Sequence, residues 1–207
     1  MVIRPETSPK EALEELYKVK KLFDQSLGRL DKFKSYQETL ELPSEKPTEI
    51  DVFTDKYQIR DIMWTVRRDF GEAKNRWYRD NWRTQDAQQI IGMVQEKTIQ
   101  LTRLSNRMAL PMGTTDDVLE AARGEVMAVR AENALITALG TPAMLDQHWT
   151  KVWSLIGGPP SSLQDFTLTQ LIEAGVKEHI ERVEEIAAFA AGEASILRTV
   201  TEISALW

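Results

Sequence analysis

The chain has 207 residues and a mass of 23.7 kDa, which fits one large domain, two small domains, or a piece of a longer protein. Hydrophobic residues make up 42% and charged residues 28%, a globular mixture that excludes collagen-like, low-complexity and disulfide-rich classes. A formal charge of −6 provides no overall basic field for nucleic acid or an anionic membrane. Cysteine is absent, which excludes disulfides and thiolate metal sites, and the longest apolar run, residues 186–191, is too short to cross a bilayer.

The first predicted element is a long amphipathic helix that starts at Ser8. Ser8 is a capping residue, Pro9 suits the first helical position, and Glu11 is placed to reach back toward the cap. Pro43 and Pro47 end the pattern, so the helix has about 30 residues and a length of roughly 45 Å. The apolar residues of its inner face recur mostly every three or four positions: Leu13, Leu16, Val19, Phe23, Leu27, Leu30, Phe33 and Leu40.

Three further helices are predicted between residues 53 and 135. The first is rich in arginine and is interrupted near Gly71 or around residues 80–81. The second runs from about Asp86 to Met108 and ends before Pro111. The third starts at Asp116 and carries its helical apolar spacing through Leu135.

The remaining chain is predicted to form a short helix and one long helix between marked turns. Residues 140–142 and 157–160, rich in Gly and Pro, are turns, and the short helix lies between them. Thr167 and Gln170 form a capping box, after which an apolar stripe continues to Trp207 with no helix-ending signal. We therefore expect an all-α fold, an elongated array of long helices joined by Gly/Pro turns, and a chain that continues beyond Trp207.

No motif for catalysis, cofactor binding or metal binding is found. A phosphate-binding loop requires a glycine followed by lysine, and no glycine in the chain has one after it. A Glu-x-x-His metal site is excluded because Leu145 and Val176 occupy the positions three before the two histidines. We therefore expect no catalytic, cofactor-binding or metal residues in this chain.

The best candidate for a binding surface is the segment 60–83. Its basic and aromatic residues are interleaved, as in proteins that hold single-stranded nucleic acid by stacking aromatic rings on the bases and contacting the phosphates. The favoured interpretation is structural: the aromatic rings fill a helix–helix seam, and the arginines reach solvent or pair with neighbouring acids. The same structural interpretation is favoured for His148, which is expected to bond a neighbouring backbone group, and for Trp149, which is expected to anchor packing.

Two motifs near the end of the chain carry a family resemblance. Residues 144–149 read Met-Leu-Asp-Gln-His-Trp, and residues 165–171 read Asp-Phe-Thr-Leu-Thr-Gln-Leu. In sequence and order they resemble the tail-to-linker region of dynein heavy chains, in particular the axonemal group. The resemblance covers nearly the whole chain and is strongest over residues 142–207. The signature positions that it implies are His148, Trp149, Phe166, Leu168, Glu193 and Trp207.

Three residues depart from the family pattern. Gln147 stands where arginine is usual, Ala134 where a proline often kinks the preceding helix, and Leu197 where glutamate is common. These departures put in doubt the polar contacts made at positions 147 and 197. They also predict a straighter helix around Ala134.

The resemblance implies a mechanical function without an active site in this segment. It implies a tail-proximal segment at 1–140 and linker helices at 141–207, with force passing from an ATP-hydrolysing ring to the tail. ATP and Mg²⁺ would bind only in that ring. The partners would be the rest of the heavy chain, other dynein heavy, intermediate and light chains, and microtubules through distant domains, in the axoneme or alternatively the cytoplasm. Gly140, Gly157 and Gly158 are candidate hinges because glycine allows backbone rotation.

Three other interpretations remain open from the sequence. A free-standing helical scaffold or adaptor of the spectrin-repeat kind would use the same amphipathic rods without a motor. A nucleic-acid-binding module would use the segment 60–83, and its binding would weaken on Arg67→Glu and Arg76→Glu. A helical-bundle enzyme lacks every motif described above.

Overall fold

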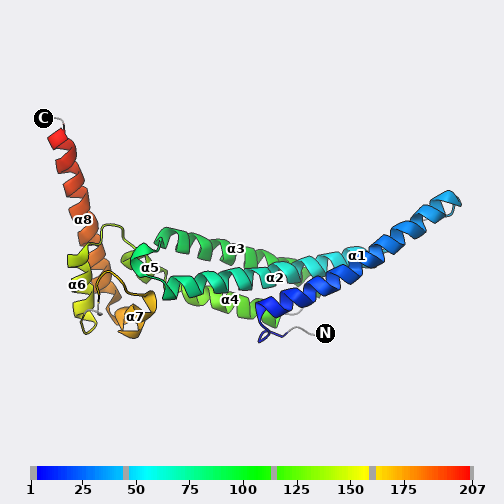
Figure 1. The fold of residues 1–207 in the computed structure, drawn as a ribbon, viewed down its shortest axis with the longest axis horizontal. Helices are drawn as coiled ribbons and strands as arrows, with labels where there is room; N and C mark the ends of the chain where they lie inside the picture. Colours follow the sequence, from blue (N-terminus) through cyan, green and yellow to red (C-terminus); the bar gives the residue numbers. More distant parts are fainter. Residues whose placement is uncertain (1–3, 44–46, 113–115, 159–161, 206–207) are drawn as a thin grey trace. The chain divides into compact units, whose positions relative to one another are not determined.

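The computed structural model describes residues 4–43, 47–112, 116–158 and 162–205. Within these ranges the chain forms eight α-helices, two short 3₁₀ helices and no β-strand, so the predicted all-α class is confirmed. In chain order the elements are α1 (Pro9–Thr39), α2 (Thr48–Arg79), η1 (Trp82–Thr84), α3 (Ala87–Met112), α4 (Asp117–Arg130), α5 (Asn133–Leu139), α6 (Asp146–Leu155), α7 (Leu168–Glu173), η2 (Val176–His179) and α8 (Ile180–Ala205) (Figure 1).

The predicted helix starts are largely confirmed by their capping bonds. The Glu11 backbone N–H donates to Ser8 Oγ over 3.2 Å at the start of α1. At α7 the Gln170 N–H donates to Thr167 Oγ1 over 3.2 Å, and the Thr167 N–H donates to Gln170 Oε1 over 2.9 Å. These reciprocal bonds satisfy backbone donors that a helix leaves open at its first turn, and so fix where the helix begins.

Of two predicted helix boundaries in the middle of the chain, one is confirmed and one needs correction. α2 passes through Gly71 without interruption, and the break lies at residues 80–81, the second of the two predicted places. A single glycine in a helix costs only about 1 kcal/mol relative to alanine, which the burial of the flanking side chains outweighs. α3 continues past Pro111 to Met112. A proline in a helix removes one backbone hydrogen bond and crowds the carbonyl four residues earlier, and here it stands one residue before the helix ends.

The single helix predicted from Asp116 through Leu135 is also wrong. The chain turns at residues 131–132, which separates α4 from α5, so the expected straight helix around Ala134 is interrupted just before that residue. Glu132 has φ −94° and ψ 3°, and its carboxylate accepts hydrogen bonds from Tyr78 and Lys177. These partners lie far from Glu132 in the sequence, so helical periodicity could not reveal the turn.

The described chain groups into two compact units, each with its own buried side chains. The first unit comprises Met1–Phe70 and Ile99–Gly124, and the second comprises Gly71–Thr98 and Glu125–Trp207. The predicted division into segments 1–140 and 141–207 concerns function and remains a prediction.

The first unit is built from α1 and from parts of α2, α3 and α4. Its largest fully buried side chains are Met63, Trp64 and Phe70 of α2 and Leu101 of α3. Phe23 of α1 stacks on a ring of α2, with 4.1 Å between the ring centroids of Phe23 and Phe53. Beyond this contact, the apolar side chains Phe33, Tyr36 and Leu40 of α1 are exposed.

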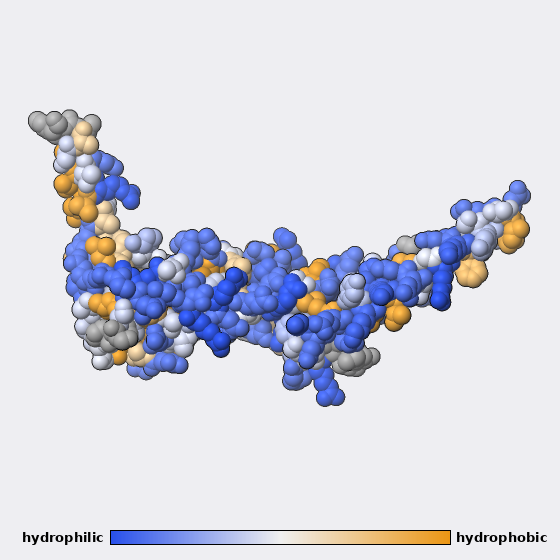
Figure 2. Space-filling model, in the orientation of Figure 1, coloured by the Kyte–Doolittle hydropathy of each residue, from blue (hydrophilic) through white to orange (hydrophobic). Residues whose placement is uncertain are grey.

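The second unit is built around α8, which packs against α5, α6 and η2. The first half of α8 buries Val183, Ala187 and Ala190. The second half exposes a row of apolar side chains, visible at the end of α8 in Figure 2: Ile196, Leu197, Val200 and Ile203. No helix in the described ranges is both long and apolar enough to cross a membrane.

Candidate functional site

His148, in the first turn of α6, is fully buried and makes two hydrogen bonds. Its Nδ1 accepts the backbone N–H of Leu145 over 3.1 Å, as expected from the sequence. Because Nδ1 acts as an acceptor, the ring hydrogen of the neutral imidazole is on Nε2. Nε2 lies 3.1 Å from Glu193 Oε2 of α8. The histidine thus caps its own helix and connects it to α8.

Gln147 reinforces the same connection. Its side-chain nitrogen donates to Glu193 Oε2 over 3.0 Å, so the carboxylate receives donors from two successive residues of α6. The sequence departs from the family pattern at Gln147, yet a polar contact to α8 is made there. Hydrogen bonds to a charged acceptor contribute about 1.5–3 kcal/mol each when buried, and less where the carboxylate is partly exposed, as it is for Glu193.

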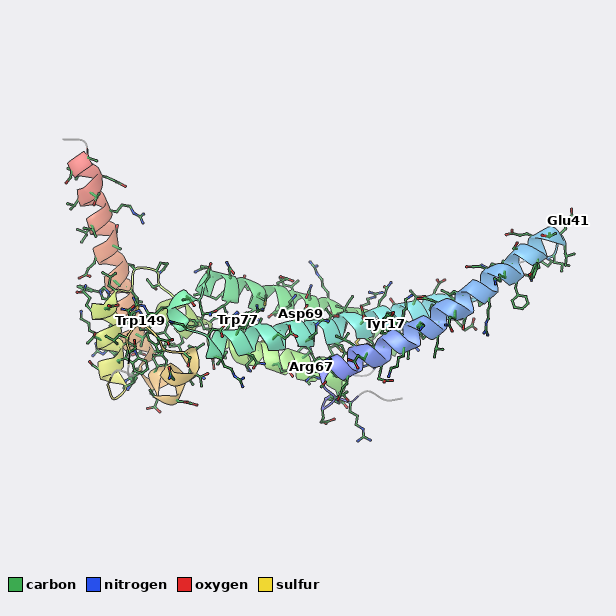
Figure 3. The ribbon with its side chains drawn as sticks, viewed as in Figure 1. Tyr17, Glu41, Arg67, Asp69, Trp77 and Trp149 are labelled. Carbon is green, nitrogen blue, oxygen red and sulfur yellow. The ribbon has the colours of Figure 1, made fainter. Side chains whose placement is uncertain are left out.

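An aromatic cluster lies on the buried face of the same short helix. Phe166 contacts two tryptophans of α6, with ring-centroid distances of 4.7 Å to Trp149 and 5.5 Å to Trp153. The tilted and edge-on arrangements are those that aromatic quadrupoles favour. Leu168 is completely buried at the start of α7. Trp149 is labelled in Figure 3.

The signature residues that the structure describes are therefore brought together. His148, Trp149, Phe166, Leu168 and Glu193 all belong to the second unit. Within it, His148 and Glu193 are bonded to each other, as Trp149 and Phe166 are in contact. Trp207 lies outside the described residues. In the described part of the chain, no group of three or more His, Asp or Glu side chains is arranged to hold a metal ion.

Arg83 is central to a network that sequence reasoning missed. Its Nη1 donates to Asp146 Oδ1 over 2.6 Å, and to Leu163 O and Gln164 Oε1 over 3.1 Å each. The adjacent Trp82 donates its backbone N–H to Phe166 O over 2.8 Å. This network fixes η1 to the loop that carries Phe166, and no local motif marks it because its partners are about 60–80 residues apart.

The three candidate hinge glycines differ in their geometry. Gly157 and Gly158 have φ values of 103° and 111°, a left-handed region that residues with a side chain rarely adopt. Gly140 has an ordinary φ of −90°. It is constrained by packing instead, because a Cβ at this position would lie 2.1 Å from Ala87 Cβ. Pro159 and Pro160 of the predicted turn lie outside the described residues.

Comparison with known proteins identifies the family. Residues 50–207 match the family described as "Dynein heavy chain, N-terminal region 2". The chain belongs to the dynein heavy chain family. This match contains all the signature residues, and it confirms the resemblance drawn from the sequence.

Individual dynein heavy chains show low but extended similarity. Dynein axonemal heavy chain 2 of Mus musculus is 25% identical over 146 residues, and the match covers 70% of this chain and 3% of the relative. Dynein axonemal heavy chain 3 of Mus musculus is 21% identical over 148 residues, with 70% and 4% covered. "Dynein-1-beta heavy chain, flagellar inner arm I1 complex" of Chlamydomonas reinhardtii is 37% identical over 75 residues, with 35% and 2% covered. The chain thus spans about one thirtieth of the length of the axonemal relatives.

The segment 60–83 of this dynein chain has most of its large aromatic side chains buried. Trp64, Phe70 and Trp82 are at most 2% exposed, so their faces are not available for bases to stack on. Two of the arginines are engaged within the chain: Arg60 pairs with Asp116 over 2.5 Å, and Arg67 donates to Pro5 O over 2.8 Å. The burial of these rings favours the structural interpretation of this segment over the nucleic-acid alternative.

A partly buried carboxylate joins three distant segments of the second unit. Glu132 accepts hydrogen bonds from the Tyr78 hydroxyl of α2 and from Lys177 Nζ of η2. Burial and the hydrogen bond to Glu132 raise the pKa of Tyr78 well above its ordinary value of 10. The neutral phenol is therefore the form that the folded chain favours.

The raised pKa of Tyr78 predicts a loss of stability in alkaline solution. In the unfolded chain the phenol ionises near pH 10, whereas in the folded chain it keeps its proton. The contribution is therefore fully present below pH 10 and is lost progressively as the pH rises above that value. Urea unfolding between pH 8 and 11 should show a steeper decline for the natural chain than for Tyr78→Phe. Equal slopes for the two proteins would contradict the prediction.

Proposed function

We propose that this segment is a non-catalytic linker part of a dynein heavy chain that transmits force from an ATP-hydrolysing ring to the tail. The observation that carries the proposal is the family match over residues 50–207. The bonds from Gln147 and His148 to Glu193 support it, because they join α6 to α8 through groups that must all break together if the helices separate. A segment that transmits force needs such internal connections.

The proposed role assigns the chemistry and the partners to other parts of the heavy chain. ATP and Mg²⁺ are bound in the ring, and microtubules are contacted by a distant domain. The nearest partner is the remainder of the same heavy chain, followed by other heavy, intermediate and light chains. The names of the relatives include "axonemal" and "flagellar inner arm", which supports a place in the axoneme of a cilium or flagellum.

The first experiment separates this proposal from a free-standing scaffold. An antibody raised against residues 142–207 is used to identify the native polypeptide on a denaturing gel, followed by peptide sequencing. A very large chain that carries Gly-x-x-x-x-Gly-Lys-Ser/Thr peptides is the expected result. A polypeptide near 24 kDa would contradict it and leave the spectrin-like scaffold.

The second experiment tests the proposed joint at Gly157 and Gly158. In the full-length motor, the double substitution Gly157→Ala/Gly158→Ala places side chains at positive φ, at a cost of about 1–2 kcal/mol per residue. We expect microtubule gliding velocity to fall while microtubule-stimulated ATP hydrolysis continues. Gly192→Ala, in an open position on α8, is the matched control and should leave both unchanged. Unaltered velocity in the double variant would refute the joint.

A further inference from the structure

A groove along the first half of α1 belongs to the first unit and has no part in the role proposed above. We refer to it as the α1 groove; its volume is about 540 Å³. Leu13 and Tyr17 supply its apolar surface, and the Tyr17 side chain is 70% exposed. Tyr17 is labelled in Figure 3. An exposed aromatic ring beside an apolar groove is a typical feature of protein-binding surfaces.

The rim of the α1 groove is strongly basic, although the whole chain carries a charge of −6. Lys10, Lys18 and Lys21 of α1 and Arg68 of α2 surround it, and Glu14 is the single acidic residue in its lining. Residues 10, 14, 17 and 21 follow the three- and four-residue spacing of one helix face. The lining of the groove therefore runs along α1 for three turns, about 16 Å, with Lys10 and Lys21 at its two ends.

Two of these cations have no acidic partner among the residues that the structure describes. Lys18 pairs with Glu15 over 2.6 Å, and Arg68 pairs with Asp69 over 2.8 Å. In the ranges that the structure describes, neither Lys10 nor Lys21 forms an ion pair. These two lysines stand at the two ends of the groove, eleven residues apart, so an occupant with carboxylates at a similar separation would meet both.

We propose that the α1 groove docks an acidic amphipathic helix of a partner protein. A helix that lies alongside α1 presents apolar side chains every three or four residues, which suits the surface of Leu13 and Tyr17. Glutamates on either side of its apolar stripe meet Lys10 and Lys21 at the two ends of the groove. This charge complementarity sets the orientation of the bound helix and the choice of partner. Single-stranded nucleic acid fits less well, because the groove offers one aromatic ring and places the Glu14 carboxylate where phosphates would lie.

The test uses two fluorescent helical peptides with the same apolar stripe. They differ only in the residues that flank this stripe, which are Glu in one peptide and Lys in the other. Binding to the purified full-length heavy chain is followed by fluorescence anisotropy at increasing salt. We expect the Glu-flanked peptide to bind at least tenfold more tightly than the Lys-flanked peptide, with affinity falling as salt rises. We also expect Lys10→Glu/Lys21→Glu to weaken its binding at least tenfold.

A matched control separates this groove from general charge. Lys32→Glu/Lys34→Glu changes the net charge by the same amount on the same helix, but outside the groove. It should leave the affinity for the Glu-flanked peptide within about twofold of that of the natural chain. Equal binding of the two peptides, or an equal loss in both double variants, would overturn the proposal. Tighter binding of a 20-nucleotide oligothymidine than of the Glu-flanked peptide would also overturn it, in favour of nucleic acid. Gliding velocity does not enter this test, so the groove and the linker role can fail separately.

Discussion

Replacing Phe166 with alanine is expected to lower the free energy of unfolding by about 3–5 kcal/mol, the largest loss that we predict for a single substitution. The ring is 1% exposed and contacts both Trp149 and Trp153. Its removal takes away buried apolar area and leaves a cavity that the two rigid indole rings cannot fill. Urea unfolding followed by tryptophan fluorescence measures the change, because the nearest reporters are the contacting rings.

Two control substitutions define this effect. Phe166→Leu retains most of the volume and should cost less than half as much as the alanine substitution. Phe33→Ala removes an equal ring from the 64% exposed position on α1 and should change stability by about 0.5 kcal/mol or less. If Phe166→Ala unfolds at the same urea concentration as Phe33→Ala, the aromatic cluster does not support the second unit in the way described.

The second large effect is expected at Gly140. Its alanine variant should lose about 1–3 kcal/mol, as overpacked sites do. The added Cβ would lie 2.1 Å from Ala87 Cβ and 2.8 Å from the backbone oxygen of Ile136, so α3 and α5 would have to move apart. The midpoint of urea unfolding is again the measurement.

Ala87→Gly tests the cause because it removes the opposing methyl group. The double variant Ala87→Gly/Gly140→Ala should be more stable than the sum of the two single changes implies, a coupling that a double-mutant cycle measures. Gly92→Ala, a position in α3 with open space around it, is the control and should be neutral or slightly stabilising. Strict additivity of the two substitutions would contradict the proposed contact.

Much of the fold follows from local sequence signals. Capping at Ser8 and at Thr167 with Gln170 marks helix starts, because those bonds join residues three apart. The turn at residues 131–132 is invisible to such reasoning, since it depends on Tyr78 and Lys177 meeting Glu132 across more than 40 residues. Local rules therefore predict the elements well and their interruptions less well.

The signature cluster was predictable in its members and only partly in its contacts. Motif order singled out His148 and Phe166, and the backbone bond of His148 was expected. The role of Arg83 was not expected. Its acceptors are one backbone oxygen, one side-chain amide oxygen and one carboxylate, and no sequence motif marks them. Sequence also placed Arg83 among candidate nucleic-acid contacts, and only its bonds to Asp146, Leu163 and Gln164 assign it to the structure.

The borders between the two units fall inside helices. Residues 70–71, 98–99 and 124–125 lie within α2, α3 and α4, with no loop at any of the three borders. A protease needs several residues of extended backbone in order to cut, so limited digestion should cleave elsewhere and should not release either unit intact. A gene fragment that encoded only one of the two units would sever all three helices.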